Sequence, residues 1–352
     1  MQPFVYNALP ARVIFGSGTL AQVGAEIQRL GCSNALVLTA SFHAKDGETL
    51  RASLGALAVG IYANATMHTP TNVTEEAVEL ANTLGADCLV ALGGGSVIGL
   101  AKAMALRTDL PQIVVPTSYS GSEATSIIGQ TANGVKTTQK TLKVLPEVII
   151  YDVDLTLTLP AQMTITSGLN AIAHAVEALY SKEANPITDM LAEQGIVRVA
   201  NALPVLGKEP HNTDARSDAL YGAWACGACL GAVSMALQHK LSHMLGGTFN
   251  LPHSETHTVL LPHTIAYNTP FATAAMAKVA RSLGAVSAAR GVFDLAKSLG
   301  APYSLKQLGM KEEDLSPAAD IAMESPYPNP APLEREGLLK LLRDAYEGKR
   351  PQ

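Results

Sequence analysis

The first 155 residues alternate short apolar runs, rich in β-branched side chains, with longer amphipathic stretches. This alternation constrains the fold more than any other feature, because strands that alternate with helices form a mostly parallel sheet covered on both faces. The predicted strands are residues 12–15, 35–39, 60–62, 88–92, 112–116 and 148–152, with helical patterns such as 19–30 and 74–84 between them. We therefore predict an α/β N-terminal domain built on a parallel sheet.

After Pro160 the alternation ends, and long helical segments rich in alanine and leucine follow. A chain of 352 residues is also long for one domain, since domains commonly hold about 100–200 residues. We place the domain boundary after residue 155 and expect an all-α C-terminal domain over residues 156–352. The helices predicted there are residues 165–181, 189–203, 215–237, 273–283 and 332–347.

Composition and charge exclude several classes of protein. Hydrophobic residues make up 47% of the chain and charged residues 16%, which argues against intrinsic disorder. A formal net charge of −5 gives no electrostatic attraction to nucleic acid or to an anionic membrane surface. The stretch 219–238 is uncharged and long enough to span a bilayer, but its glycine, alanine and cysteine content favours a buried helix. We expect no nucleic-acid partner, no membrane segment and no signal peptide.

The four cysteines are too few for a disulfide framework in a chain of this length. Three of them, Cys88, Cys226 and Cys229, lie in apolar runs, and the fourth is Cys32. We expect reduced thiols and a cytoplasmic location. Cys226 and Cys229 have the spacing of a redox or metal motif, but no second pair completes a zinc site, so core packing is the favoured interpretation.

A glycine-rich loop follows the predicted strand 88–92 and precedes a helical pattern over 97–106. Backbone N–H groups at such a helix start can bind a phosphate, and glycines allow a close approach. The loop does not complete a dinucleotide motif, because Ile98 stands where the last glycine belongs, nor a P-loop, because Leu100 replaces the lysine. A tight turn and a non-standard pyrophosphate site both remain open. The loop residues are Gly93, Gly94, Gly95 and Ser96.

A second candidate loop follows the predicted strand 112–116 and is rich in hydroxyl groups. Loops of this composition are common, so the pattern alone is weak support for a ligand site. Its residues are Thr117, Ser118, Tyr119, Ser120, Gly121, Ser122 and Glu123.

Five of the nine histidines fall within residues 232–263. His239 and His243 are one helical turn apart and share a face, and His253 follows ten residues later. Asn170 and His174 form a second pair at the same spacing. Such side chains could meet as a metal site or an acid–base site, although any single histidine could be a hydrogen-bonded core residue.

The order of these motifs resembles the iron-containing (group III) alcohol dehydrogenase family over nearly the whole chain. The resemblance implies a Rossmann-like NAD(P) domain with a parallel sheet, an all-α C-terminal domain, catalysis in the cleft between them and a homodimer or larger assembly. This architecture is also called the dehydroquinate synthase-like fold. The motifs are Gly93–Ser96, Pro116–Thr117, Gly121–Glu123, Pro146 with Tyr151–Asp152, Gly168-x-Asn170-Ala171-x-x-His174, His239-x3-His243-x-Leu245-Gly246, Leu251–His253 and Leu260–His263.

The resemblance also implies roles for individual residues. In metal-dependent members an Asp and three His bind the metal, and their positions fall on Asn170, His174, His239 and His253. Because a neutral amide is a poor ligand for a hard divalent ion, we expect no metal. The implied cofactor contacts are Gly93, Gly94, Gly95, Ser96, Thr117, Ser118, Ser122, Lys136 and Thr39, and the implied substrate contacts are Asn170, His174, His239, His253 and Tyr119.

Ala40 stands where many family members carry the Asp that binds the adenosine ribose. No carboxylate then repels a 2′-phosphate, so we expect NADH as cofactor with NADPH also accepted.

Within the family, Asn170, the hydroxyl-rich loop and Asn329-Pro330-x-Pro332 are similar to the maleylacetate reductases. Members of this subfamily reduce the carbon–carbon double bond of maleylacetate to give 3-oxoadipate in bacterial aromatic catabolism. The resemblance implies a dicarboxylate substrate, with His243 as the leading proton donor and His253 as the second. His174 and His239 would bind substrate or stabilise an oxyanion. A metal-dependent alcohol or polyol dehydrogenase and a catalytically silent nucleotide-binding protein are the alternatives.

Overall fold

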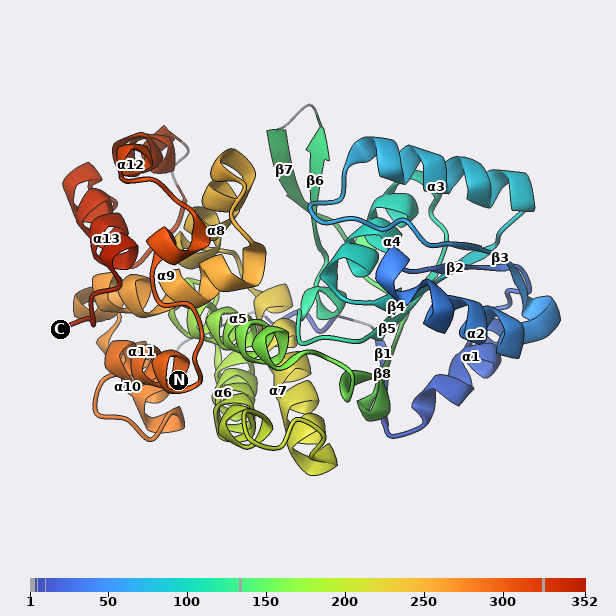
Figure 1. Ribbon diagram of the computed structural model, residues 1–352, viewed down its shortest axis with the longest axis horizontal. Helices are drawn as coiled ribbons and strands as arrows, with labels where there is room; N and C mark the ends of the chain where they lie inside the picture. Colours follow the sequence, from blue (N-terminus) through green and yellow to red (C-terminus); the bar gives the residue numbers. More distant parts are fainter. Residues whose placement is uncertain (1–3, 5, 10, 133–134, 325–326) are drawn as a thin grey trace. The chain divides into compact units, whose positions relative to one another are not determined.

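The computed structural model describes residues 4, 6–9, 11–132, 135–324 and 327–352. It divides into two compact units, Leu9–Leu159 and Pro160–Gln352, the second including described residues that precede Leu9. Each unit is described by itself (Figure 1).

The first unit is built on a six-stranded parallel sheet with the order β1-β8-β5-β4-β2-β3. All six predicted strands are present and all pair in parallel, as the alternation with helices predicts. The strands are β1 (Arg12–Gly16), β2 (Ala35–Leu38), β3 (Ala58–Tyr62), β4 (Cys88–Gly93), β5 (Gln112–Pro116) and β8 (Val148–Asp152).

Helices cover both faces of this sheet. Leu36 and Leu38 of β2 pack with the helices on one face, whereas Ala35 and Val37 pack with those on the other. The alternation follows from the two-residue period of a strand. The helices are α1 (Val23–Arg29), α2 (Ala44–Leu54), α3 (Thr71–Leu84) and α4 (Gly95–Thr108), with short 3₁₀ turns at Thr19–Gln22, Ser41–His43, Gly55–Leu57, Ser122–Ala124, Leu142–Val144 and Val153–Thr156.

A two-stranded antiparallel sheet was not predicted from the sequence. It consists of β6 (Ile127–Ala132) and β7 (Val135–Lys140), paired from Ile127 with Lys140 to Ala132 with Val135. Its strands are mostly polar, and the described side chains of β6 are mainly half-buried. A hairpin with little buried apolar surface leaves almost no hydrophobic pattern in a sequence.

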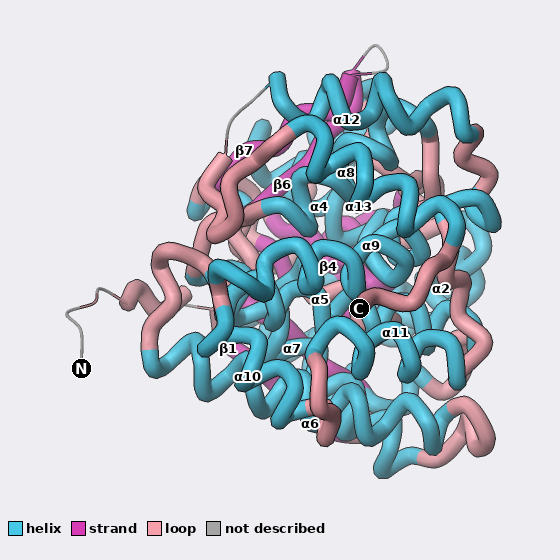
Figure 2. The backbone as a smooth tube through the Cα atoms, turned by 90° about the vertical axis from the view of Figure 1, so that its left-hand side faces the viewer, coloured by secondary structure: helices cyan, strands magenta, loops and turns pink. Residues whose placement is uncertain are grey.

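The second unit contains only helices among its described regular elements, which are cyan in Figure 2. Its helices are α5 (Ala161–Tyr180), α6 (Pro186–Leu206), α7 (Thr213–Ala232), α8 (Leu237–Phe249), α9 (His253–Asn268), α10 (Thr273–Ser282), α11 (Ala288–Ser298), α12 (Leu315–Glu324) and α13 (Arg335–Glu347), with 3₁₀ turns at Thr269–Phe271, Leu305–Leu308 and Glu312–Asp314.

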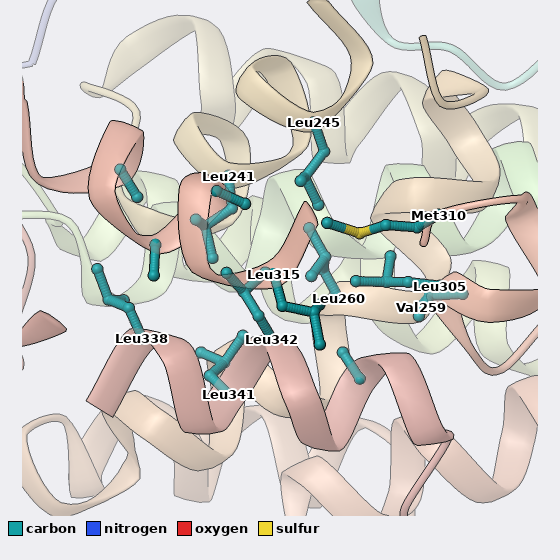
Figure 3. Packing of buried hydrophobic residues seen from close by; sticks show 14 of the residues in the cluster. Leu241, Leu245, Val259, Leu260, Leu305, Met310, Leu315, Leu338, Leu341 and Leu342 are labelled. Atoms are coloured by element: carbon teal, nitrogen blue, oxygen red, sulfur yellow. The ribbon is translucent and has the colours of Figure 1, made fainter. Parts of the chain in front are cut away.

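Two features of this unit position the functional side chains. Helix α5 is enclosed by its neighbours, and every residue from Thr164 to Tyr180 is buried. Leucines of α8, α9, α12 and α13 form an apolar cluster that fixes α8 and α9 against each other (Figure 3). Polar side chains of α5, α8 and α9 are therefore held in a rigid, desolvated interior.

One predicted helix, over residues 215–237, is wrong as a single element. Helix α7 ends at Ala232, α8 begins at Leu237, and the two axes are bent by 98°. Buried and half-buried carboxylates hold the four-residue break, because Glu183 accepts hydrogen bonds from the Ser234 N–H and hydroxyl and Glu177 accepts one from the Ala236 N–H. This long-range pairing leaves no local signal in the sequence.

No single described helix is long and apolar enough to cross a membrane, although the bent pair α7 and α8 meets the length and composition criteria together. Cys226 and Cys229 on α7 are fully buried, and burial raises the pKa of the Cys229 thiol to about 12. Their packing agrees with a structural role in the core.

Candidate active site

Five histidine rings from three helices converge inside the second unit. His174 comes from α5, His239 and His243 from α8, and His253 and His257 from α9. The ring centroids of His174 and His239 are 5.2 Å apart, those of His239 and His257 4.7 Å, and those of His253 and His257 4.6 Å. The structure therefore brings together the four histidines that the motifs single out, and adds a fifth.

Helical spacing explains how the rings meet. His239 and His243 lie one turn apart on α8, and His253 and His257 lie one turn apart on α9. Asn170 lies one turn before His174 on α5 and is 3% exposed. His257 was missed because Pro262 lies inside α9 and argues against a helix there. Its i, i+4 spacing from His253 is the signal that could have found it.

A buried carboxylate, Glu177, was also missed. Its Oε1 accepts a hydrogen bond from Nδ1 of His239 at 2.9 Å, and its Oε2 accepts from the Tyr180 hydroxyl at 3.1 Å and the His239 N–H at 3.3 Å. A carboxylate partner fixes the proton of His239 on Nδ1, so Nε2 carries a lone pair. Nε2 makes no hydrogen bond within the described part of the chain and is buried.

Burial also keeps two of the rings neutral. Desolvation lowers the pKa of His174 well below its usual range, and repulsion from His239 and His253 lowers it further. The pKa of His257 is lowered for the same reasons, desolvation first and then the four neighbouring imidazoles. At neutral pH these rings are uncharged, which is the form that binds a metal or exchanges single hydrogen bonds.

The histidine cluster fits a divalent transition metal. Nδ1 of His174 and Nε2 of His239 are buried and make no hydrogen bond to any described residue. Unpaired buried polar atoms are rare in proteins, and a bound ion, a water molecule or a substrate group would satisfy these two. Candidate ligand atoms of His243, His253 and His257 also lie within 4.8 Å of one another. Neutral imidazoles suit zinc and iron, so the donor set matches that class of ion.

In the first unit, the predicted cofactor residues gather at one edge of the sheet. Thr39, Gly94 and Thr117 follow the carboxyl ends of β2, β4 and β5, which are neighbours in the sheet. Ligands of parallel sheets bind at this edge. A Cβ atom on Gly94 would lie 3.0 Å from Oγ of Ser118, so the two loops pack tightly together.

The start of α4 has the features of a phosphate site. Gly94 is its N-cap, and no described side chain caps the helix there. Free N–H groups at a helix start attract anions. Gly95 is exposed, and Ser96 and Ser122 are half-buried, whereas Tyr119 is fully buried. The side chain of Lys136 lies outside the part of the chain that the structure describes.

A buried lysine, Lys102, holds the end of the hydroxyl-rich loop through hydrogen bonds. Nζ of Lys102 donates to the carbonyl oxygen of Ser122 in the loop, and to those of Thr125 and Ile127 just after it at 2.7 and 2.9 Å. Glu123 accepts a hydrogen bond from the Tyr151 hydroxyl at 2.8 Å. Both charged side chains are fully buried. They give the loop a defined shape that its sequence alone does not suggest.

Comparisons with known proteins agree along the whole chain. A model described as "Iron-containing alcohol dehydrogenase" matches residues 10–153, and one described as "Fe-containing alcohol dehydrogenase family, C-terminal" matches residues 164–346. A maleylacetate reductase of Rhizobium sp. (strain MTP-10005) is 53% identical over 352 residues and 100% of both chains.

Solved structures show the same relationship. A maleylacetate reductase from Agrobacterium tumefaciens has a TM-score of 0.96 and 54% identity over 100% of both chains. An iron-containing alcohol dehydrogenase from Corynebacterium glutamicum has a TM-score of 0.94 and 38% identity over 100% of this chain and 99% of that one. These matches confirm the predicted fold class and the resemblance to maleylacetate reductases.

The expectation of no metal is wrong, because the matching family is defined as iron-containing and implies a divalent metal, iron. The expectation gave too much weight to one ligand position. Asn170 removes a carboxylate, but the imidazoles remain, and Glu177 supplies a negative charge directly behind His239.

The motif order, the parallel sheet with its helical partner unit and the full-length matches lead to one conclusion. The chain is an oxidoreductase that belongs to the iron-containing alcohol dehydrogenase family.

Proposed function

We propose that this enzyme uses NAD(P)H to reduce the carbon–carbon double bond of maleylacetate, giving 3-oxoadipate in bacterial aromatic catabolism. The observation that carries the proposal is the 53% identity, over the full length of both chains, to a protein named maleylacetate reductase. Asn170 at the position of a ligand carboxylate also supports this subfamily.

The proposed reaction requires a hydride donor, hydrogen-bond donors for an oxygen that becomes negative, and an acid that protonates carbon. Hydride adds to the alkene carbon remote from the keto group, and negative charge collects on the keto oxygen as an enolate. Hydrogen-bond donors must stabilise that oxygen, and an acid must protonate the neighbouring carbon. A cluster of imidazoles can perform both tasks near neutral pH.

We assign the leading proton donor to His243 and the second to His253. Both are half-buried, whereas His174, His239 and His257 are buried, so these two can exchange protons with substrate and water. His174, His239 and His253, with Asn170 beside them, are the residues that would hold a divalent ion. When bound, such an ion supplies Lewis-acid polarisation of a substrate oxygen. Glu177 holds His239 in the tautomer that this requires.

The cofactor site is proposed at the carboxyl edge of the sheet, with the pyrophosphate at Gly94 and the start of α4. Ala40 follows β2 and is fully buried, so no carboxylate at that position repels a 2′-phosphate. This supports the use of NADPH beside NADH. We also propose a cytoplasmic homodimer, because all four cysteines are free thiols, which is typical of a reducing compartment, and because the family resemblance implies a dimer.

The proposal is tested by two assays on the purified enzyme. Oxidation of NADH is followed with maleylacetate, and reduction of NAD⁺ is followed with simple alcohols and polyols. We expect turnover with maleylacetate and little with alcohols. Activity on alcohols alone would replace the proposal with an alcohol or polyol dehydrogenase, and cofactor binding without either activity would indicate a silent nucleotide-binding protein.

A further inference from the structure

His257 is the most enclosed ring of the cluster and has no role in the function proposed above. It is fully buried, and its centroid lies 4.7 Å from that of His239, 4.6 Å from that of His253 and 6.4 Å from that of His243. By position alone it could complete a three-histidine metal site with His243 and His253. Which of its nitrogens carries the proton decides whether it can.

The orientation of a buried glutamine settles that question. Nε2 of Gln238 lies 3.1 Å from the carbonyl oxygen of His257, and its Oε1 lies 2.6 Å from the Thr264 hydroxyl, which also has the carbonyl oxygen of Leu261 at 3.0 Å. A carbonyl oxygen only accepts hydrogen bonds, so the amide nitrogen must face it. The reversed amide would place two carbonyl oxygens 3.1 Å apart. Gln238, His257 and Thr264 are at most 1% exposed, so no water offsets that repulsion.

The same amide nitrogen lies 3.1 Å from Nδ1 of His257. An amide NH₂ group only donates, so Nδ1 must be the acceptor and carry a lone pair. A neutral imidazole then has its proton on Nε2. Nε2 of His257 is buried and makes no hydrogen bond to a described residue. An unpaired buried donor is unfavourable, and an oxygen acceptor placed at Nε2 would satisfy it.

His239 has the opposite arrangement. Nδ1 of His239 donates to the carboxylate of Glu177, so Nε2 of His239 is an acceptor. Two neighbouring rings in one cluster are thus fixed in opposite tautomers by two buried partners, a carboxylate and an amide. The first ring offers a lone pair, and the second offers an N–H group.

We propose that His257 is a hydrogen-bond donor of the active site, excluded from metal binding by Gln238, and that it donates to the substrate oxygen on which negative charge collects. The assignment of the oxygen rests on the proposed function. The assignment of the tautomer does not, since it follows from the contacts of Gln238 alone.

The tautomer is tested directly by NMR of protein labelled with ¹⁵N-histidine, stripped of metal and then saturated with Zn²⁺. The two neutral tautomers have distinct patterns of ¹⁵N–¹H couplings. His257 is assigned from the signal that His257→Leu removes. We expect the proton on Nε2 in both states. A proton on Nδ1, or a shift of the Nε2 signal to that of a zinc-bound nitrogen, would overturn the proposal.

Paired variants test the role. His257→Gln keeps an N–H donor, whereas His257→Leu removes it, and His263→Leu is the matched control because it removes another buried histidine from α9 outside the cluster. We expect His257→Leu to lower kcat by about 10²–10³-fold, the usual effect of losing one oxyanion donor. His257→Gln should recover part of this loss, and the Kd for Zn²⁺ should stay within about twofold in all three variants.

A fall in zinc affinity of tenfold or more in His257→Leu, with no such fall in His263→Leu, would show that His257 is a ligand and overturn the proposal. Equal kcat values for His257→Leu and the parent enzyme would show that His257 does not donate to the substrate oxygen. If the parent enzyme does not reduce maleylacetate, the proposed function fails, but the NMR and zinc measurements still decide whether His257 is a donor.

Discussion

Glu177→Gln is the substitution that most directly tests how the histidine cluster is built. It keeps the size of the side chain but replaces one carboxylate oxygen with an NH₂ group, so the charged carboxylate becomes a neutral amide. The carboxylate accepts hydrogen bonds from four donors, namely the N–H groups of Ala236 and His239, the His239 ring and the Tyr180 hydroxyl. Among the described residues, only the ring of His239 lies close enough to Glu177 to form an ion pair, so hydrogen-bond donors rather than a lysine or an arginine stabilise the carboxylate.

The magnitude follows from where the new amide nitrogen can lie. The retained oxygen can still accept from Ala236 and from the ring of His239, and the Tyr180 hydroxyl can rotate to accept from the new NH₂ group. The backbone N–H of His239 is then opposed by a donor, which costs about 1–3 kcal/mol. Loss of charge on the two remaining bonds adds roughly 1 kcal/mol. The total of about 2–4 kcal/mol lowers Tm by roughly 10 °C, at about 2–4 °C per kcal/mol for a unit of this size.

The second effect concerns the metal. Without the carboxylate, the proton on Nδ1 of His239 is less strongly fixed and Nε2 becomes a weaker ligand. Loss of such a partner commonly reduces metal affinity by about 10–100-fold. Zinc affinity is measured by competition with a chromophoric chelator, and Tm by calorimetry on metal-free protein.

Glu183→Gln is the matched control. Glu183 holds the same break between α7 and α8 through Ser234 but does not contact a ring of the cluster. It should lower Tm by less and leave zinc affinity unchanged. The reasoning is refuted if Glu177→Gln binds zinc as tightly as the parent protein, or if both variants lose affinity equally.

Four further outcomes are expected. Gly94→Val should raise the KM for NADH with the fold intact, because its methyl groups would keep a phosphate away from the backbone N–H groups at the start of α4; unchanged NADH binding would refute the loop assignment. His243→Ala should lower kcat by about 10²–10⁴-fold, the scale of a general acid, as measured by steady-state kinetics. Asn170→Asp should bind zinc more tightly in the chelator assay, because a carboxylate is a better ligand for a divalent ion. Burial lowers the pKa of His263 to about 4, so the folded state takes up its proton only below the pH at which the unfolded chain does. Stability should therefore fall as pH drops from about 6.5 to 4, by up to about 3 kcal/mol from this group, and His263→Leu should reduce that slope in denaturant titrations.

Much of the fold could be predicted from the sequence because its strands and turns depend on patterns among neighbouring residues. Strands buried on both faces leave continuous apolar runs, as in 88–92 and 148–152, and glycines mark the turn before α4. His239, His243 and His174 were found because helical spacing and motif order are visible in the chain.

The missing parts are long-range. Glu177 contacts a ring 62 residues away, and Gln238 contacts one 19 residues away, so neither pairing has a local pattern. Pro262 lies inside the helix that carries His257, and a proline inside a segment argues against predicting a helix there. The importance of Asn170 was overestimated for the same reason. The negative charge near the rings comes from Glu177, and no local sequence pattern connects Glu177 to His239.

The enclosure of α5 has a consequence for how the site assembles. Amide protons of a helix buried on every side exchange with solvent only when its surroundings open, so those from Thr164 to Tyr180 should be among the slowest in hydrogen-exchange mass spectrometry. This helix carries His174 and the anchor of His239. A nascent or partly unfolded chain therefore cannot hold His174 beside His239, and we expect it to bind a divalent ion only after the helical unit has closed.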